Sequence, residues 1–140
     1  MKELTSAEVF DIVWSSLRNS ELANEVPTMY PDRFPETTTN SHITGEFIVV
    51  SPLSNALGDI QAATVNVNIY SPDSTPTIDR IEQRYPNRKR LGELTRLAYN
   101  ALNIYPLDER YYFKVLSETL LSEQDFPYSF INLKVQLKNY

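Results

Sequence analysis

The sequence predicts an α+β fold, in which two main helices pack on one face of a mostly antiparallel sheet built from two hairpins. Apolar and polar residues alternate over positions 60–70, 110–120 and 131–137, as is typical of strands with one buried face. Residues 6–20 and 87–103 instead carry apolar side chains at helical spacing. The resulting order is α-β-β-α-β-β. Segregated hairpins and helices favour this class over alternating parallel units.

The size and composition of the chain fit one domain. It has 140 residues, of which 41% are hydrophobic and 22% are charged, enough to bury a core of its own. We therefore expect a single domain over residues 1–140, with a long irregular loop at about 24–44. A net charge of -5 argues against general binding to nucleic acid or to an anionic membrane. Since MKELTSAEVF lacks the apolar core of a signal peptide, we expect synthesis and retention in a cytoplasm.

The first helix is expected over about Ser6–Ser20. Thr5 and Glu8 form a capping-box pattern, in which each side chain satisfies a free backbone amide. The apolar stripe of this helix needs a sheet to cover it. It consists of Phe10, Val13, Trp14 and Leu17.

Residues 24–44 contain prolines and threonines without a sustained period, which indicates a long irregular loop. A loop of this length in a small domain is usually functional or mobile. The run Gly45–Ser51 is apolar and rich in β-branched residues, so it is predicted to be a strand with both faces covered. Pro52 is predicted to end it.

The next strand is expected over Ile60–Tyr70, in an antiparallel pair with the first. Val65, Val67 and Ile69 fall on one face, and the other face carries Asn66, Asn68 and Tyr70. Ser71-Pro72-Asp73 is predicted to end the strand. Uncharged amides can hydrogen-bond without the desolvation penalty of buried charge, so the face of Asn66, Asn68 and Tyr70 is a candidate subunit contact.

A second helical pattern runs from about Asp79 to Leu102, but Pro86 lies inside it and must kink the helix or mark a fresh start. The clear part is Asn87–Asn103. Its core-facing stripe consists of Leu91, Leu94, Leu97, Ala98, Ala101 and Leu102.

The last two strands are expected over Arg110–Leu120 and around Ile131–Leu137. Tyr111, Phe113 and Val115 share one face of the first of these strands. The polar face of the last strand carries Lys134 and Lys138, a common protection for an exposed sheet edge.

Five basic residues crowd the segment DRIEQRYPNRKR: Arg80, Arg84, Arg88, Lys89 and Arg90. The spacing of Arg80, Arg84 and Arg88 would place them on one helix face. Two interpretations remain open, a solvated face or a surface that meets an acidic patch of a neighbouring subunit.

The loop SEQDFPYSF carries Phe126 and Tyr128 on either side of Pro127. These rings are candidate anchors for a partner groove. The alternative is that both rings fold back over the sheet edge.

The sequence offers no catalytic, metal-binding or cofactor-binding site, and we predict no enzyme activity and no cofactor. There is no cysteine, the three glycines are isolated, and His42 is the single histidine. A carboxylate pair for glycoside hydrolysis is the one catalytic class that the composition leaves open.

Residues 5–75 resemble small tail-completion or tail-terminator proteins from the head-to-tail connector of tailed bacteriophages. The resemblance rests on Glu8-Val9-Phe10 and Leu17, then on MYPDRFPE, EFIVV and GDIQAATVNVNIYSPD. It implies a structural virion protein without catalytic residues, located at the neck. It further implies a homo-oligomeric ring, often of about six or twelve subunits, between the portal/connector and the tail.

The partners implied by this resemblance are portal/connector and tail proteins, with DNA only as cargo passing through a channel and no membrane. The Arg80–Arg90 face would meet a neighbouring subunit or, as a weaker alternative, line the channel. A second hypothesis is a small non-catalytic binding or adaptor module that acts as a monomer or dimer.

Overall fold

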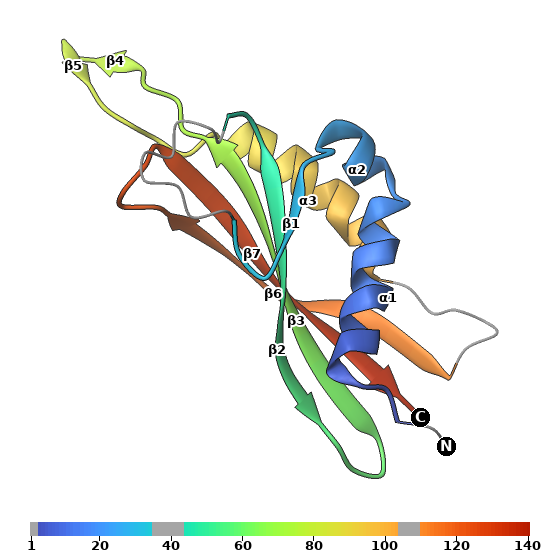
Figure 1. Ribbon diagram of the computed structural model, residues 1–140. Coiled ribbons are helices and arrows are strands. Elements are labelled where there is room, and N and C mark those ends of the chain that lie inside the picture. Colours follow the sequence, from blue (N-terminus) through green and yellow to red (C-terminus); the bar gives the residue numbers. More distant parts are fainter. Residues whose placement is uncertain (1–2, 35–43, 104–109) are drawn as a thin grey trace.

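The computed structural model describes residues 3–34, 44–103 and 110–140. Its elements are, in chain order, α1 (Ser6–Arg18), α2 (Glu21–Glu25), β1 (Met29–Pro31), β2 (Phe47–Ala56), β3 (Gln61–Pro72), β4 (Thr77–Ile78), β5 (Ile81–Glu82), α3 (Arg88–Leu102), β6 (Tyr111–Ser122) and β7 (Tyr128–Asn139). Figure 1 shows a twisted five-stranded sheet, in the order β1-β2-β3-β7-β6, beside the helices. The α+β class is confirmed, but the predicted order α-β-β-α-β-β is incomplete, because α2, β1 and the β4–β5 pair were not predicted. The sheet is mixed because β1 runs parallel to β2.

The helix α1 begins with the predicted capping box. The Glu8 amide donates to Thr5 Oγ1 and the Thr5 amide donates to Glu8 Oε1, each over 3.1 Å. The helix ends earlier than expected, and α2 follows it after Ser20. Ser20 Oγ donates to the Leu17 carbonyl over 2.6 Å, and such local side-chain bonds compete with helix continuation.

The region expected to be one irregular loop holds the end of α2 and the short strand β1. Met29–Pro31 pairs with Ile48–Val50. Residues 35–43, including His42, lie outside the described ranges.

The prediction that Pro52 ends the strand is wrong, because β2 continues to Ala56. Pro52 lies beside a bulge and beyond the part of β2 that pairs with β1, and edges and bulges are the places where a strand tolerates proline.

The last strand, β7, lies inside the sheet, between β3 and β6. The interpretation of Lys134 and Lys138 as protection for a sheet edge is therefore wrong. Lys134 is exposed because its side chain lies on the polar face of the sheet, opposite Asn66 of β3. In the part of the chain that the structure describes, the edge strands are β1 and β6.

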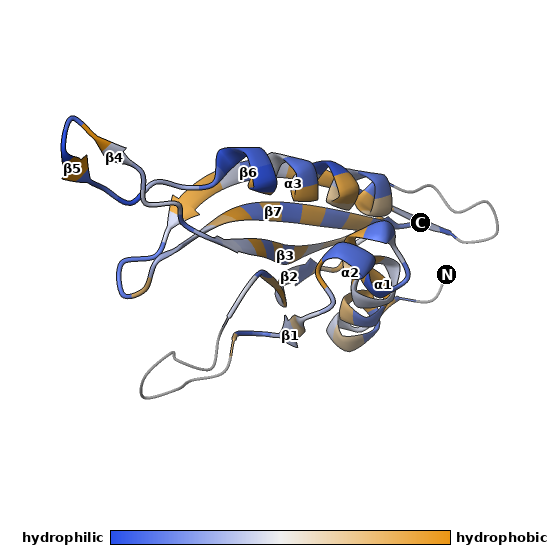
Figure 2. Cartoon of the chain, turned by 90° about the horizontal axis from the view of Figure 1, so that it is seen from above, coloured by the Kyte–Doolittle hydropathy of each residue, from blue (hydrophilic) through white to orange (hydrophobic). Residues whose placement is uncertain are grey.

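One hydrophobic core joins α1 and α3 to the strands. Val65, Val67 and Ile69 of β3 belong to it, as predicted, together with Val13 of α1 and Leu94 of α3. Figure 2 shows the alternating hydropathy along β7 and the apolar side of α3 turned toward the strands. The opposite face of the sheet carries a separate aromatic cluster. It consists of Phe47, Val49, Tyr70, Phe126 and Tyr128, with Tyr30, Phe34 and Phe130 packed against it.

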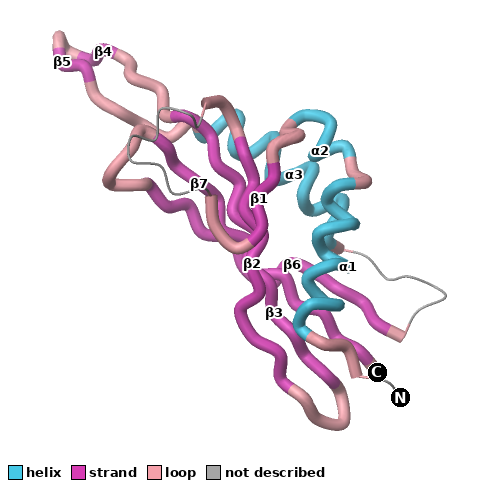
Figure 3. Tube along the Cα trace, in the orientation of Figure 1, coloured by secondary structure: helices cyan, strands magenta, loops and turns pink. Residues whose placement is uncertain are grey.

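The segment before α3 is a β-hairpin and not a helix, so the prediction of one helical face for Arg80, Arg84 and Arg88 is wrong. Asp79 and Arg80 have φ values of 51° and 66°, which close the turn between β4 and β5. Pro86 marks the fresh start, and the Asn87 side chain caps α3. We call residues Thr77–Glu82 the arm, and Figures 1 and 3 show it projecting from one end of the sheet.

Candidate interaction surfaces

Arg84 anchors the arm and is not a free surface cation. Its Nε lies 3.0 Å from Asp73 Oδ2, and the Asp73 side chain is only 2% exposed. Ser129 Oγ donates to the other Asp73 oxygen over 2.6 Å. The Arg84 guanidinium also donates to the carbonyl oxygens of Phe126 and Glu123, over 3.2 and 2.9 Å. Arg84 therefore joins the base of the arm to the β6–β7 loop, and we call this group of contacts the arm root.

Arg90 is likewise engaged within the chain. Its Nε and Nη2 donate to the two oxygens of Glu46 over 2.7 and 2.9 Å, a bidentate pair, and Glu25 and Glu93 lie at 3.4 Å. The hydrogen bonds to Glu46 are the largest cause that raises the pKa of Arg90. Because Glu46 directly precedes β2, Arg90 ties the start of α3 to the sheet.

The other three basic residues are exposed. Arg80 lies in the turn of the arm, while Arg88 and Lys89 open α3. None of them forms an ion pair with another residue of the described ranges. A contact between the basic segment and a partner stays a prediction, and these three residues are the ones available for it.

Asn66 and Asn68 belong to a ladder of amides across two strands. Asn68 lies opposite Asn132 of β7, and Asn132 Nδ2 donates to Asn68 Oδ1 over 2.7 Å and to Asn66 Oδ1 over 3.3 Å. All three side chains are partly buried. The amide groups on this face of the sheet are therefore partly hydrogen-bonded to one another within a single chain.

Tyr70 belongs to the aromatic cluster and not to the amide ladder. Its ring stacks on Phe47, with centroids 4.4 Å apart, and on Phe130, at 4.6 Å. Its hydroxyl donates to Glu123 Oε1 over 3.1 Å. Burial raises the pKa of Tyr70, and Glu123 raises it further by its charge and its hydrogen bond.

Phe126 and Tyr128 lie folded over the sheet, with exposures of 8% and 7%. The ring of Phe34 packs edge-on against Phe126 at 5.3 Å, and the Tyr128 hydroxyl donates to the Gly45 carbonyl over 3.0 Å. Either ring would have to leave this cluster to anchor a partner.

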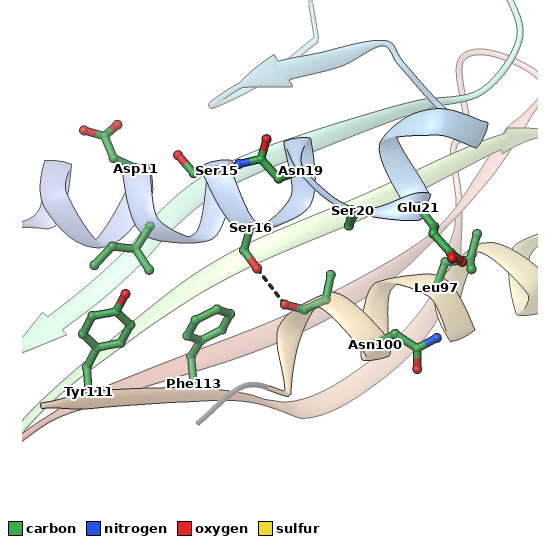
Figure 4. Close-up of a pocket in the computed structure, with 12 residues that line it drawn as sticks. Asp11, Ser15, Ser16, Asn19, Ser20, Glu21, Leu97, Asn100, Tyr111 and Phe113 are labelled. Carbon is green, nitrogen blue, oxygen red and sulfur yellow. Dashed lines mark hydrogen bonds between the residues drawn. The ribbon is translucent and has the colours of Figure 1, made fainter. Parts of the chain in front are cut away.

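A groove between α1 and α3 was not expected from the sequence. Its volume is about 860 Å³. Figure 4 shows Tyr111 and Phe113 of β6 below α1, and Ser16 Oγ donating to the Ala101 carbonyl over 2.7 Å. The one sequence signal was a run of short polar residues on α1. The α1–α3 groove is lined by Asp11, Ile12, Ser15, Ser16, Asn19, Ser20, Glu21, Leu97, Asn100, Ala101, Tyr111 and Phe113.

Exposed apolar side chains lie on the arm, at the β2–β3 hairpin and along the edge strand β6. Ile78 and Ile81 of the arm are 53% and 63% exposed. The others lie at the β2–β3 hairpin and along β6, and they are Leu53, Leu57, Ile60, Leu116, Leu120 and Leu121. Single exposed apolar residues are ordinary, but three such groups on a small protein favour interaction surfaces.

Residues 3–34, 44–103 and 110–140 contain no group of three or more His, Cys, Asp or Glu placed to hold a metal ion. Within the same ranges, no helix combines the length and apolar character that crossing a membrane requires.

Comparison with known proteins gives a likeness in fold and none in sequence family. No family model and no curated protein matches the chain. A chain of a solved structure described as "Virion of native gene transfer agent (GTA) particle" superposes with a TM-score of 0.55 at 15% sequence identity. The match covers 91% of this chain and 90% of the other, so the two share an overall fold.

Proposed function

We propose that the chain is a non-enzymatic structural virion protein that forms a ring at the neck of a phage-like particle, between the portal/connector and the tail. The observation that carries this proposal is the likeness in fold to a chain of a gene transfer agent virion over nine tenths of both chains. The sequence resemblance of residues 5–75 to tail-completion and tail-terminator proteins points to the same class.

The exposed surfaces support assembly. A ring needs two different surfaces on each subunit, one of which meets the other surface of the next copy. The arm, the α1–α3 groove and the exposed leucines of β6 supply distinct surfaces of this kind. DNA would then be cargo in the central channel, and the virion would be the site of function.

Native mass spectrometry and negative-stain electron microscopy of the purified protein test the ring. We expect a uniform closed oligomer of about six or twelve copies, formed by the protein alone or with its portal and tail neighbours. A stable monomer or dimer in the presence of those neighbours contradicts the proposal.

The α1–α3 groove favours a second candidate function, a small binding or adaptor module. Its volume of about 860 Å³ lies in the range of small-molecule sites, and its lining combines apolar and polar groups. Thermal-shift screening of the purified protein with a metabolite library tests this function. A saturable ligand that stabilises a monomer or dimer supports it over the ring.

A further inference from the structure

The face of the sheet that points away from the hydrophobic core carries positive charge at one end. The register places Asn66 of β3, Lys134 of β7 and Ser117 of β6 in one row across this face. On the same face, Lys114 of β6 lies opposite Gln136 of β7. Among the described residues that the five-stranded sheet places on this face, the charged ones are all lysines: Lys114, Lys134 and Lys138. We call this end of the sheet the lysine face.

The lysine face has charge that the described chain does not neutralise. None of the three lysines forms an ion pair with another residue of the described ranges. A hydrogen bond with Tyr140, and after it the charges of Lys138 and Lys114, lower the pKa of Tyr112. Uncharged amides beside the lysines add hydrogen-bonding groups. In a chain with 18 acidic and 13 basic residues, this face suits an acidic and polar partner surface.

The segment of α1 and α2 carries the opposite charge. Residues 3–25 contain five carboxylates and a single cation, which gives a balance of -4. The carboxylates are Glu3, Glu8, Asp11, Glu21 and Glu25, and the cation is Arg18. Asp11 lies about 200° around α1 from the buried Val13, so it points away from the hydrophobic core. Glu3, Asp11 and Glu21 are exposed and form no ion pair within the described ranges, and we call them the acidic side.

We propose that the lysine face of one copy docks on the acidic side of α1 and α2 of a second copy. This inference rests on the proposed ring and names a contact within it. The core that joins α1 to the sheet separates the two surfaces within one chain, so they meet only between copies. Because the two surfaces are different, the contact is heterologous and propagates from copy to copy.

Charge and length both favour this pairing over the other surfaces of the described chain. The arm carries two carboxylates and one cation, and residues 53–60 carry one carboxylate, so each has a balance of -1. Neither approaches the balance of -4 in the α1–α2 segment. The polar stretch 132–138 of β7 extends about 20 Å, and α1, with 13 residues, is also about 20 Å long. The helix therefore matches the end of the sheet that carries the lysines.

Cysteine cross-linking tests the contact directly, because the chain has no cysteine of its own. Ser117 lies opposite Lys134 on the lysine face, and Ser15 lies one turn after Asp11 on α1. Both serines are exposed, and changing them to cysteine leaves every charge in place. Equal amounts of full-length Ser117→Cys and Ser15→Cys, mixed and mildly oxidised, are expected to form the mixed dimer at least about tenfold faster than the control mixture.

The control mixture pairs Ser15→Cys with Ser74→Cys, an equally small change at an exposed position outside the lysine face. A mass tag on the Ser15→Cys chain distinguishes the mixed dimer from dimers of either variant alone. Equal rates for the two mixtures overturn the proposal.

A charge swap provides a second readout. Reversing two charges of the lysine face, with Lys134→Glu and Lys138→Glu, is expected to raise the concentration needed for half-maximal assembly about tenfold or more. Adding Asp11→Lys and Glu21→Lys to the same chain is expected to recover part of that loss. Urea denaturation of each variant separates a loss of folding from a loss of assembly.

The outcomes distinguish this contact from the proposed ring. Assembly that is insensitive to the two lysine reversals removes the lysine face from the contact and leaves the ring standing. A loss of assembly that the reversals on α1 and α2 do not recover assigns the lysine face to a different acidic partner and overturns the proposal. If the wild-type chain forms no ring even with its virion neighbours, the proposed function fails, while the cross-linking rates still report on docking of the lysine face.

Discussion

Gln61 shows how much one polar residue contributes when it occupies a core-facing position of a strand. Its side chain is 0% exposed. Its amide accepts from the Leu4 amide over 2.9 Å and donates to the Leu4 carbonyl over 2.6 Å. It also bonds to Asn55 and Asn139, over 2.7 and 3.1 Å. Gln61 thus joins the segment before α1 to the strands β2, β3 and β7.

Replacing Gln61 with Leu is expected to lower the free energy of unfolding by about 2–3 kcal/mol. Leucine has a similar volume but removes the acceptor of the Leu4 amide and the donor to Asn55 Oδ1, and an unsatisfied buried polar group costs about 1–3 kcal/mol. Urea denaturation followed by circular dichroism measures the loss. The matched control is Gln136→Leu, on the polar face of β7, which is expected to change stability by about 0.5 kcal/mol or less. Equal effects would mean that the Gln61 contacts contribute no stability of their own.

Tyr70 is expected to make the free energy of unfolding depend on pH in the alkaline range. Burial first, and then Glu123, raises the pKa of Tyr70 in the folded state above its ordinary value of about 10. The native state therefore holds the phenol proton more tightly than the unfolded state does. The resulting stabilisation is complete below about pH 10 and is lost as pH rises through the folded pKa.

Tyr70→Phe is therefore expected to be less stable than the wild type at neutral pH, by about 0.5–1.5 kcal/mol for the lost hydrogen bond to Glu123. Above about pH 10 the wild type loses stability faster than Tyr70→Phe, and the difference between them narrows. Urea midpoints measured from pH 7 to 11 follow this change. A difference that stays constant over the whole range would contradict the role given to the Tyr70 proton.

The attachment of the arm depends on the arm root. Arg84→Ala leaves Asp73 buried without its cation, and breaking a fully buried pair costs about 3–5 kcal/mol. The Arg84 side chain is 38% exposed, so we expect a smaller loss, about 2 kcal/mol, and faster amide hydrogen exchange over Thr77–Glu82. Arg80→Ala, which removes the same side chain at the tip, is expected to leave both measurements unchanged. Unchanged exchange in Arg84→Ala would show that the arm is held by its backbone contacts alone.

Features whose signal lies within one element are predicted correctly from the sequence. Thr5 and Glu8 marked the start of α1, and the alternation of Val65, Val67 and Ile69 identified the buried face of β3. Features that depend on strands distant in the sequence are not. Pro52 is tolerated because β1 pairs only with the other half of β2, and Lys134 lies on a central strand because β7 inserts between β3 and β6.

The candidate surfaces follow the same rule. The sequence identified Asn66 and Asn68 as neighbours on one face, but their partner Asn132 comes from a strand more than 60 positions away, set beside them by sheet register. The sequence alone places Arg84 and Arg90 among the surface cations. Their carboxylate partners, Asp73 and Glu46, lie at other places in the chain and come close only through the fold. Tertiary pairing of this kind leaves no local pattern.

At the scale of the whole molecule, the five basic residues of the segment 80–90 have two different roles. Arg84 and Arg90 form ion pairs within the chain, while Arg80, Arg88 and Lys89 form none with the described residues. Arg84 and Arg90 support the fold, so charge reversal at either one would confuse loss of folding with loss of assembly. Arg88 and Lys89 are exposed in the first turn of α3, where the helix dipole disfavours positive charge and where no acidic residue is present. Their position therefore lowers the stability of the isolated chain. Since the protein has a net charge of -5, a neighbouring copy can offer an acidic surface, and this favours a role for Arg88 and Lys89 in such a contact.

Reversing both charges, with Arg88→Glu and Lys89→Glu, is therefore expected to move stability and assembly in opposite directions. Negative charge at the start of α3 complements the helix dipole, so the free energy of unfolding should rise by about 0.5–1 kcal/mol at low salt. Assembly should weaken, and the dependence of the remaining assembly on ionic strength should fall, because charge complementarity across the contact is lost. Chemical denaturation and native mass spectrometry over a salt series measure the two effects. The matched control is Arg96→Glu, a charge reversal in the middle of α3, which should change stability and assembly much less than the double reversal does. If assembly is unchanged by the double reversal, Arg88 and Lys89 are not part of the subunit contact.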